Sequence, residues 1–311
     1  MIHKEEFFFN SASGNTKIHA IRYIPNGNIK GILQITHGMV EYIERYEEFA
    51  NFLASRGILV TGHDHLGHGK SINSKEDLGY FSKENGNKTL LYDIYQLTQI
   101  TKETYPNHPY FLLGHSMGSF YARQYLCEFG QELDGAIIMG TGNQPKLLLN
   151  LGCLLIKMIA LFKGWHYRCT FIDNMAFGSY NKNFSPSRTS KDWLSKDYTK
   201  VDQYVADSLC GFTFTLNAYY NMFQGMLRLH DKNLLSRMQK NLPIFFVAGD
   251  MDPVGDFGKG VLQVSQDFRK LGMKNVELKL YPNDRHEILN EIDRDDVYKD
   301  IYTWLYSHLD T

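Results

Sequence analysis

Apolar residues alternate with polar ones, or run without interruption, in eight short segments of the chain, and this spacing is typical of β-strands. The segments are Lys4–Phe9, Lys17–Tyr23, Gly31–Thr36, Ile58–Gly62, Tyr110–Leu113, Gly135–Met139, Pro243–Ala248 and Val276–Tyr281. Between the later strands, apolar residues recur at helical spacing, as in Tyr42–Arg56, where Gly57 is placed to end the helix. This alternation predicts an α/β fold, with helices on both sides of a mostly parallel eight-stranded sheet.

The connection between the sixth and seventh predicted strands is much longer than a crossover requires, at roughly 100 residues. It predicts a helical cap, or lid, at residues 143–224, inserted between a first core part at 1–142 and a second at 225–311. Within the cap, Leu147–Phe162 is strongly apolar but too short and too interrupted by polar residues for a transmembrane helix. Two compatible interpretations stay open for it. The helix packs on the core, or it forms an acyl-chain tunnel or a lid that contacts a membrane surface transiently.

The pentapeptide Gly114-His115-Ser116-Met117-Gly118 lies between a predicted strand and a helical pattern at Ser119–Glu128. Strand, tight Gly-x-Ser-x-Gly turn and helix together form a nucleophile elbow, in which the turn pushes the serine hydroxyl out beyond the sheet. Glycines two residues on either side remove side chains that would collide there. Ser116 is therefore the candidate nucleophile.

A nucleophilic serine needs a base and an acid that orients the base, and both follow strand ends further along the chain. His286 follows the last predicted strand and is the predicted general base. Asp252 is the predicted acid, because the following Pro253 disfavours helical geometry and keeps it in an extended loop end. Asp250 is expected to satisfy turn amides instead, and Asp256 is a third choice. The order Ser, Asp, His along the chain is the one expected of an α/β-hydrolase.

The oxyanion hole of such an enzyme is formed by two backbone amides. One belongs to the residue after the nucleophile, which is Met117. The other follows the third strand, where His37-Gly38-Met39 places the amide of Met39. His37 is expected to order this loop through backbone hydrogen bonds.

Three motifs carry a resemblance to a known family: His37-Gly38 followed by Glu41, Arg45 and Tyr46; Asp64-His65-Leu66-Gly67-His68-Gly69-Lys70-Ser71; and Gly114 to Gly118. The chain resembles the monoacylglycerol lipase and lysophospholipase group of the α/β-hydrolases, also described as serine aminopeptidase S33 or hydrolase 4. The resemblance covers both core parts and is weak across residues 143–224. It implies a triad of Ser116, Asp252 and His286, with oxyanion amides at Met39 and Met117.

The resemblance also implies a glycerol site: in monoacylglycerol lipases, a glutamate, an arginine and a second histidine bind the glycerol hydroxyls. Glu41 and Arg45 match the first two, but Leu289 stands where the histidine is expected, and Tyr42 replaces the usual histidine after the glutamate. An apolar side chain cannot donate to a hydroxyl, so discrimination for glycerol is expected to be lost. We therefore expect an enzyme tolerant of its alcohol group, with Glu41 and Arg45 paired to each other.

The segment His63-Asp64-His65-Leu66-Gly67-His68-Gly69 contains ligand types that could hold zinc or iron. The resemblance implies instead a structural loop after the fourth strand, and serine chemistry requires neither metal nor cofactor. The sequence thus predicts a serine hydrolase that cleaves carboxylic esters of monoacyl lipids, such as monoacylglycerols or lysophospholipids. An aminopeptidase of the proline iminopeptidase type is an alternative, and a non-catalytic binding hydrolase is a third.

Composition adds the expected compartment and partners. The chain has 311 residues and a formal net charge of -1, so it offers no basic field for nucleic acid. Its 4 cysteines form no paired framework, and the N-terminus is not a signal peptide, so a cytoplasmic enzyme acting on a small ester or monoacyl lipid is expected. There is no internal repeat, and the sequence leaves the oligomeric state open.

Overall fold

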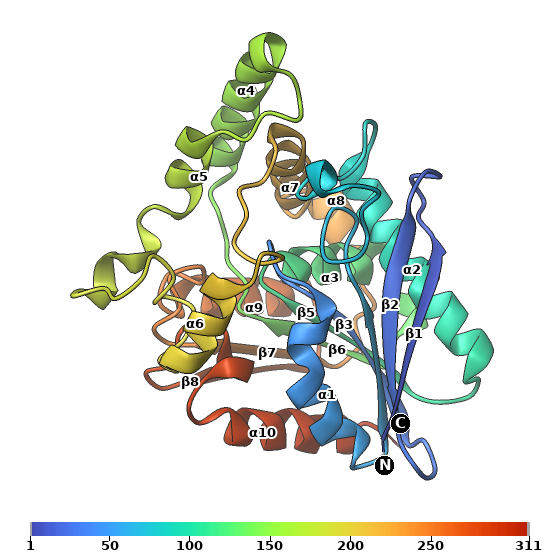
Figure 1. The fold of residues 1–311 in the computed structure, drawn as a ribbon. Coiled ribbons are helices and arrows are strands. Elements are labelled where there is room, and N and C mark those ends of the chain that lie inside the picture. The colour runs from blue at the N-terminus through green and yellow to red at the C-terminus, as the bar shows by residue number, and fades with distance from the viewer. Residues whose placement is uncertain (1, 310–311) are drawn as a thin grey trace.

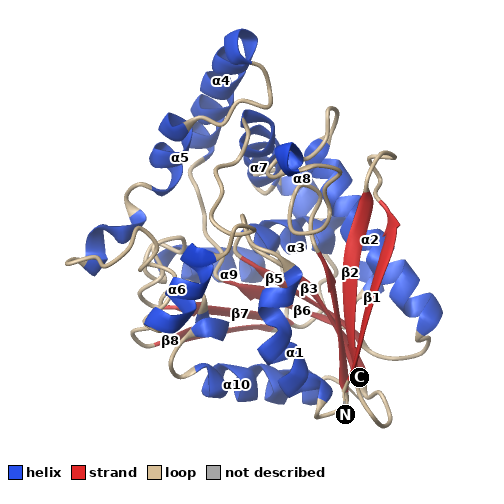
Figure 2. Ribbon diagram, in the orientation of Figure 1, coloured by secondary structure: helices blue, strands red, loops and turns tan. Residues whose placement is uncertain are grey.

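The computed structural model describes residues 2–309, and its centre is an 8-stranded sheet with the strand order β1-β2-β4-β3-β5-β6-β7-β8 (Figures 1 and 2). The strands are β1 (His3–Asn10), β2 (Lys17–Ile24), β3 (Gly31–Thr36), β4 (Ile58–His63), β5 (Tyr110–His115), β6 (Gly135–Met139), β7 (Ile244–Gly249) and β8 (Val276–Tyr281). Strand β2 pairs antiparallel with both neighbours, and all pairs from β4 to β8 are parallel. Every predicted strand is present, with small shifts at the ends, and the predicted fold class is confirmed.

Helices cover both faces of the sheet, which explains why strands β3 to β7 are buried along their whole length. One face packs against α1 (Glu47–Ala54) and α10 (Arg294–Tyr306). The other packs against α2 (Gly86–Thr104), α3 (Met117–Glu128) and α9 (Lys259–Lys270). Parallel strands all point their carboxyl ends to one edge, and the loops that carry the predicted site residues therefore meet there.

The helix predicted over residues 42–56 is shorter in the structure than predicted, and a 3-10 turn precedes it. A 3-10 turn at Ile43–Tyr46 precedes α1, and the backbone leaves the α-helical region at Tyr46, with φ -92° and ψ 5°. The helix ends before Gly57, which has φ +93° and takes the conformation that only glycine adopts without strain.

Between β6 and β7 the chain forms a largely helical segment, and we call residues 143–224 the insertion. Its elements are α4 (Lys146–Lys163), α5 (Thr170–Phe177), a 3-10 turn (Tyr180–Phe184), α6 (Tyr198–Ala206) and α7 (Leu216–Arg228), and the short α8 (Lys232–Leu235) follows. Helices α4 and α5 stand away from the sheet at the top of the view in Figure 1. The predicted end of the insertion at residue 224 falls inside α7, which belongs to the same hydrophobic core as α2 and α3.

Helix α4 buries one face and exposes the other. Leu149, Cys153 and Ile156 are buried against the core, whereas Leu161 and Phe162 are 83% and 88% exposed. The other apolar side chains that it exposes are Leu147, Leu148, Leu151, Leu154 and Met158. Among the described residues, no helix has both the length and the apolar character needed to cross a membrane.

Candidate active site

Ser116 lies at the sharp turn between β5 and α3, in the geometry that the Gly-x-Ser-x-Gly pattern predicts. Its φ is 53° and its ψ is -119°, a backbone conformation that a non-glycine residue rarely adopts. A Cβ atom at Gly114 would lie 2.4 Å from the carbonyl oxygen of Gly118, and one at Gly118 would lie 2.1 Å from that of Thr36. The strained turn therefore closes only with glycine at both positions, and it lifts Ser116 to the carboxyl edge of the sheet.

The loops after β7 and β8 bring Asp252 and His286 together. Oδ2 of Asp252 lies 2.9 Å from Nδ1 of His286, and both side chains are buried. Asp250 instead accepts the backbone N–H of Asn283 at 2.7 Å, as expected for a turn aspartate, and Asp256 is exposed. Of the three aspartates considered, the structure places only Asp252 beside the histidine.

Ser116 and His286 line the same cavity, which has a volume of about 170 Å³. Among the described residues no hydrogen bond joins the Ser116 hydroxyl to His286, and catalytic hydrogen bonds are often long before substrate binds. One wall of the cavity is apolar and comes from α3, α4 and α7: Phe120, Leu148, Leu149, Met222, Phe223 and Met226. The insertion therefore supplies a large part of the surface that faces Ser116.

The amides of Met39 and Met117 both belong to residues that line this cavity. Neither N–H donates to any described residue, so both donors are available to a ligand. The loop before Met39 approaches Ser116 closely, because a Cβ at Gly38 would lie 3.2 Å from the Cβ of Ser116. Two free amides in the cavity that Ser116 lines match the arrangement that binds an oxyanion.

Glu41 holds the loop that carries Met39. Its carboxylate accepts the N–H of Gly38 at 2.6 Å and the hydroxyl of Tyr46 at 2.8 Å, and it pairs with Arg45 at 2.5 Å. Burial acts to raise the pKa of Glu41, but the charges and hydrogen bonds of Arg45 and His115 outweigh it and lower the pKa. The same carboxylate raises the pKa of His115 against the opposing effect of burial. Glu41 is thus an ionised anchor inside the protein.

Arg45 does not line this cavity, but it is bound by two carboxylates that do. It makes a two-pronged ion pair with Glu287, at 2.8 Å and 2.7 Å, in addition to its bond with Glu41. The sequence did not predict a role for Glu287, because only its position after His286 marks it. Its partner Arg45 is 242 positions away in the chain. Arg45 and Leu289 line a separate cavity of about 10 Å³, which has room for about one water molecule. That space cannot hold a glycerol group.

The histidine-rich loop after β4 is packed as a structural element. His37 bonds to the carbonyl of Gly38 through Nδ1 (2.7 Å) and accepts the N–H of His65 at Nε2 (2.9 Å). Burial lowers the pKa of His63 and of His68 to about 3, so both are neutral. In the described part of the chain, the geometry for holding a metal ion occurs only at Asp284, Glu291 and Asp293, and not among these histidines.

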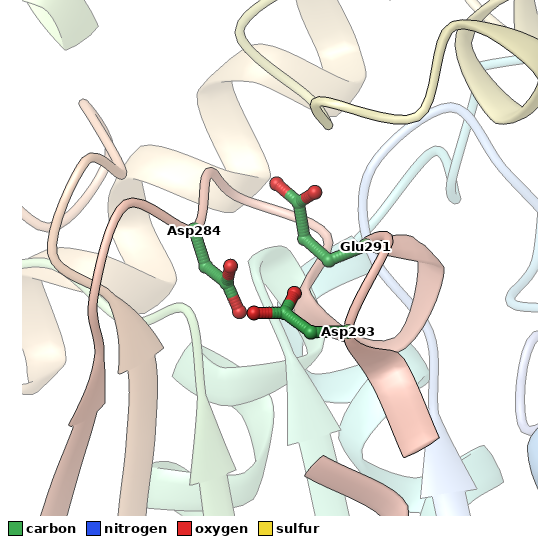
Figure 3. A group of neighbouring side chains, drawn as sticks. All are labelled: Asp284, Glu291 and Asp293. Atoms are coloured by element: carbon green, nitrogen blue, oxygen red, sulfur yellow. The ribbon is translucent and has the colours of Figure 1, made fainter. Parts of the chain in front are cut away.

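Those three carboxylates lie together after β8 (Figure 3). Lys196 already supplies the positive charge, since its Nζ is 2.5 Å from Asp284 and 3.6 Å from Asp293. Glu291 accepts the backbone N–H groups of Lys196 and Arg285. Burial raises the pKa of Asp284 to about 7. The group therefore acts as an anchor between the insertion and the loop that carries His286.

The segment Lys191–Lys196 of the insertion is fastened to that loop along its length. The N–H of His286 donates to the carbonyl of Trp193 at 3.4 Å, and the N–H of Glu287 donates to that of Leu194 at 2.7 Å. The Trp193 ring lies 5.1 Å from the ring of His286. Sequence reasoning missed this segment, because no motif marks it.

A family model described as "Serine aminopeptidase, S33" matches residues 27–293, which is most of the chain. The chain belongs to this family. The resemblance found in the three motifs is thereby confirmed, and the protein is a hydrolase with the α/β-hydrolase fold.

Several relatives match this protein over nearly its whole length. A thermostable carboxyl esterase from Bacillus coagulans, solved in complex with glycerol, superposes with a TM-score of 0.91 at 30% identity, covering 99% of this chain and 100% of that one. The monoglyceride lipase homolog of monkeypox virus is 26% identical over 282 residues, 90% of this chain and 91% of that protein. The monoglyceride lipase of Mus musculus is 25% identical over 291 residues, 90% of this chain and 84% of that protein.

Proposed function

We propose that this protein hydrolyses carboxylic esters of single acyl chains, with Ser116 as nucleophile, His286 as general base and Asp252 as its orienting acid. The observation that carries the proposal is the strained Ser116 turn, which shares one largely apolar cavity with a histidine held by a buried aspartate. The family and its relatives, which include a carboxyl esterase and monoglyceride lipases, support the same enzyme class, a serine carboxylic-ester hydrolase.

The reaction proceeds by acyl transfer in two steps. Nε2 of His286 takes the proton of Ser116 as Oγ attacks the ester carbonyl carbon, and the amides of Met39 and Met117 donate to the oxyanion. Collapse of this intermediate breaks the bond to the alcohol oxygen, which takes the proton from His286 and leaves an acyl-enzyme. Water attacks the acyl-enzyme, with His286 again as base, and the carboxylic acid departs from regenerated Ser116.

The cavity favours a substrate with one long alkyl chain. Its apolar wall from α3, α4 and α7 would cover the chain and exclude water from the ester, which strengthens every electrostatic interaction there. The insertion acts in this proposal as the cap predicted at residues 143–224.

On the alcohol side we propose a site that does not select glycerol. Arg45 is committed to two carboxylates, and the small cavity that it shares with Leu289 is too small for a glycerol group. The test compares a 1-monoacylglycerol with the ethyl ester of the same fatty acid. We expect kcat/KM values within about tenfold of each other, and a preference for the glycerol ester above about a hundredfold would overturn this tolerance.

An aminopeptidase site needs an unpaired acid that receives the substrate's free amine. The described acids that line the cavity already have a cation beside them, because Glu41 and Glu287 bind Arg45 and the charge of Asp173 acts on Lys191. This arrangement favours the esterase over the peptidase.

The exposed apolar face of α4 supports the proposal that the cap contacts a lipid surface transiently. Side chains such as Leu161 and Phe162 would lie among the acyl chains at the interface. Sedimentation with neutral vesicles tests it: the variant Leu161→Asp with Phe162→Asp should lose binding and keep its activity on a dissolved ester. Unchanged binding would contradict this contact.

A fluorophosphonate probe with an ester panel tests the enzyme class. The wild type should be labelled at Ser116 and should hydrolyse esters of graded acyl length, and it should not cleave an amino-acid arylamide. Labelling elsewhere, or cleavage of the arylamide alone, would overturn the proposal. A protein that is neither labelled nor active would be a binding hydrolase.

A further inference from the structure

Val40, which follows the proposed oxyanion donor Met39, has a strained backbone. Its φ is 51°, in the left-handed region that favours glycine. Of the described non-glycine residues with positive φ, Val40 is the only β-branched one, and such a side chain very rarely adopts this conformation. Strain of this kind persists only where the surrounding contacts hold the residue in place. The contacts of Val40 therefore show what fixes the loop around Met39.

The insertion supplies those contacts. The carbonyl oxygen of Val40 accepts the N–H of Gly211 at 3.0 Å and the hydroxyl of Tyr204, in α6, at 3.2 Å. Among the described residues, the backbone of Val40 makes no other hydrogen bond. Tyr204 and Gly211 lie side by side, because a Cβ at Gly211 would lie 3.2 Å from Cε1 of the tyrosine ring. Tyr204 is 164 positions away from Val40 in the chain, so the cap reaches back to hold the core loop.

Met39 lies between two anchors, and only one of them belongs to its own loop. On one side, the N–H of Gly38 donates to the buried carboxylate of Glu41. On the other side, the insertion holds the carbonyl of Val40. Met39 and Val40 both line the cavity with Ser116. If Val40 relaxed to a negative φ, the chain would turn at the residue next to Met39, and the direction of the Met39 amide would change with it.

We propose that Tyr204 is a positioning residue: through its hydrogen bond to Val40, it holds the strained loop in which the Met39 amide faces the oxyanion. This inference rests on the proposed ester hydrolysis and gives the insertion a role in the chemical step besides covering the acyl chain. Oxyanion donors are effective when they are in place before the reaction, because no free energy is then spent on turning them. The strain at Val40 makes that arrangement depend on the cap.

The test begins with kcat and KM on one dissolved octanoyl ester, with active sites counted by fluorophosphonate labelling. Tyr204→Phe removes the hydroxyl and keeps the ring, which lines the cavity and whose centroid lies 4.8 Å from Cζ of Arg45. It should lower kcat about fivefold to tenfold and change KM by less than about twofold. The matched control is Tyr198→Phe, the same change in α6 at a side chain that is 59% exposed and does not line the cavity. An equal loss of kcat in the control would overturn the inference.

Substitutions at Val40 test whether strain is the cause. Val40→Gly relieves the strain, because glycine adopts this φ at no steric cost, whereas Val40→Ala removes most of the same side chain and keeps the Cβ. Adding Tyr204→Phe should therefore lower kcat by about fivefold or more in Val40→Ala and by less than about twofold in Val40→Gly. Equal losses in the two backgrounds would contradict a role for the strain and overturn the inference.

A transition-state analogue reports on the oxyanion itself. An octyl trifluoromethyl ketone forms a hemiketal with Ser116: Oγ bonds to the carbonyl carbon, its proton passes to His286, and the ketone oxygen becomes an oxyanion. The inhibition constant should rise in Tyr204→Phe by about the factor by which kcat falls, because both depend on the same donors. An unchanged inhibition constant would place the effect outside the oxyanion hole and overturn the inference.

The same measurements separate this inference from the proposed function. A wild type that hydrolyses the octanoyl ester, together with a Tyr204→Phe variant that keeps the full kcat, refutes the role of Tyr204 and leaves the esterase standing. A wild type that neither hydrolyses the ester nor reacts with the fluorophosphonate refutes both.

Discussion

Replacing Asp252 by asparagine should abolish most activity without changing the shape of the site. Both carboxylate oxygens of Asp252 are used, because Oδ1 accepts the N–H of Val254 at 2.9 Å and Oδ2 faces Nδ1 of His286 at 2.9 Å. Asparagine has one oxygen and one NH2 group. If its oxygen keeps the bond to Val254, its NH2 donates to Nδ1 of His286 and forces the proton onto Nε2. In that tautomer His286 cannot accept the proton of Ser116.

The expected loss in kcat is about 10⁴-fold, as in other triads in which this change traps the wrong tautomer, and it corresponds to about 5.4 kcal/mol of barrier. The matched control is Asp250→Asn. Asp250 accepts a single turn amide, that of Asn283, and an asparagine oxygen can accept the same bond, so the loss there should stay below about threefold.

The assay measures kcat and KM on one dissolved acyl ester for both variants, with active sites counted by fluorophosphonate labelling and folding checked by thermal unfolding. Equal losses in the two variants, or a larger loss in Asp250→Asn, would refute the assignment of Asp252. A loss in Asp252→Asn that is accompanied by unfolding would be re-examined with Asp252→Ser, which leaves no NH2 group facing His286 and should recover part of the activity.

The remaining predictions concern the nucleophile, the loop anchor and the acid stability. Ser116→Ala should remove ester hydrolysis by about four to six orders of magnitude in a folded protein, because triad members act as a unit, and retained turnover would exclude the serine mechanism. Glu41→Gln should lower kcat about tenfold or more, with little change in KM, because the amide of Gly38 loses its bond to an ionised carboxylate. The loss should be the same on glycerol and ethyl esters. A rise in KM for the glycerol ester alone would instead show that Glu41 binds glycerol. Burial lowers the pKa of His68 to about 3. Below about pH 6.5 the unfolded chain therefore binds a proton at His68, whereas the folded protein does not. As the pH falls, this difference lowers the free energy of unfolding by about 1.4 kcal/mol per pH unit. Urea unfolding of His68→Leu between pH 6 and pH 4 should show that much less slope than the wild type, and an unchanged slope would contradict a neutral, buried His68.

The sequence by itself determined the strands, the Gly-x-Ser-x-Gly turn and the order of the proposed triad residues along the chain. Strand bounds such as Gly31–Thr36 follow from apolar runs, since residues buried on both faces of a parallel sheet must be apolar. Ser116 could be located because its strained turn excludes side chains at Gly114 and Gly118, and that local steric requirement is written in five consecutive residues. Position after a strand end was enough to nominate His286.

Only the tertiary structure decided what surrounds those residues. Pro253 already favoured Asp252 over Asp250 in the sequence, but only the structure shows the loops after β7 and β8 bringing the Asp252 carboxylate to His286. Arg45 is paired with Glu287 through a contact between segments far apart in the chain. Such contacts have no periodicity or motif in the sequence. They arise where the loops that follow different strands meet at the carboxyl edge of the sheet, and that packing determines which charged side chains are paired.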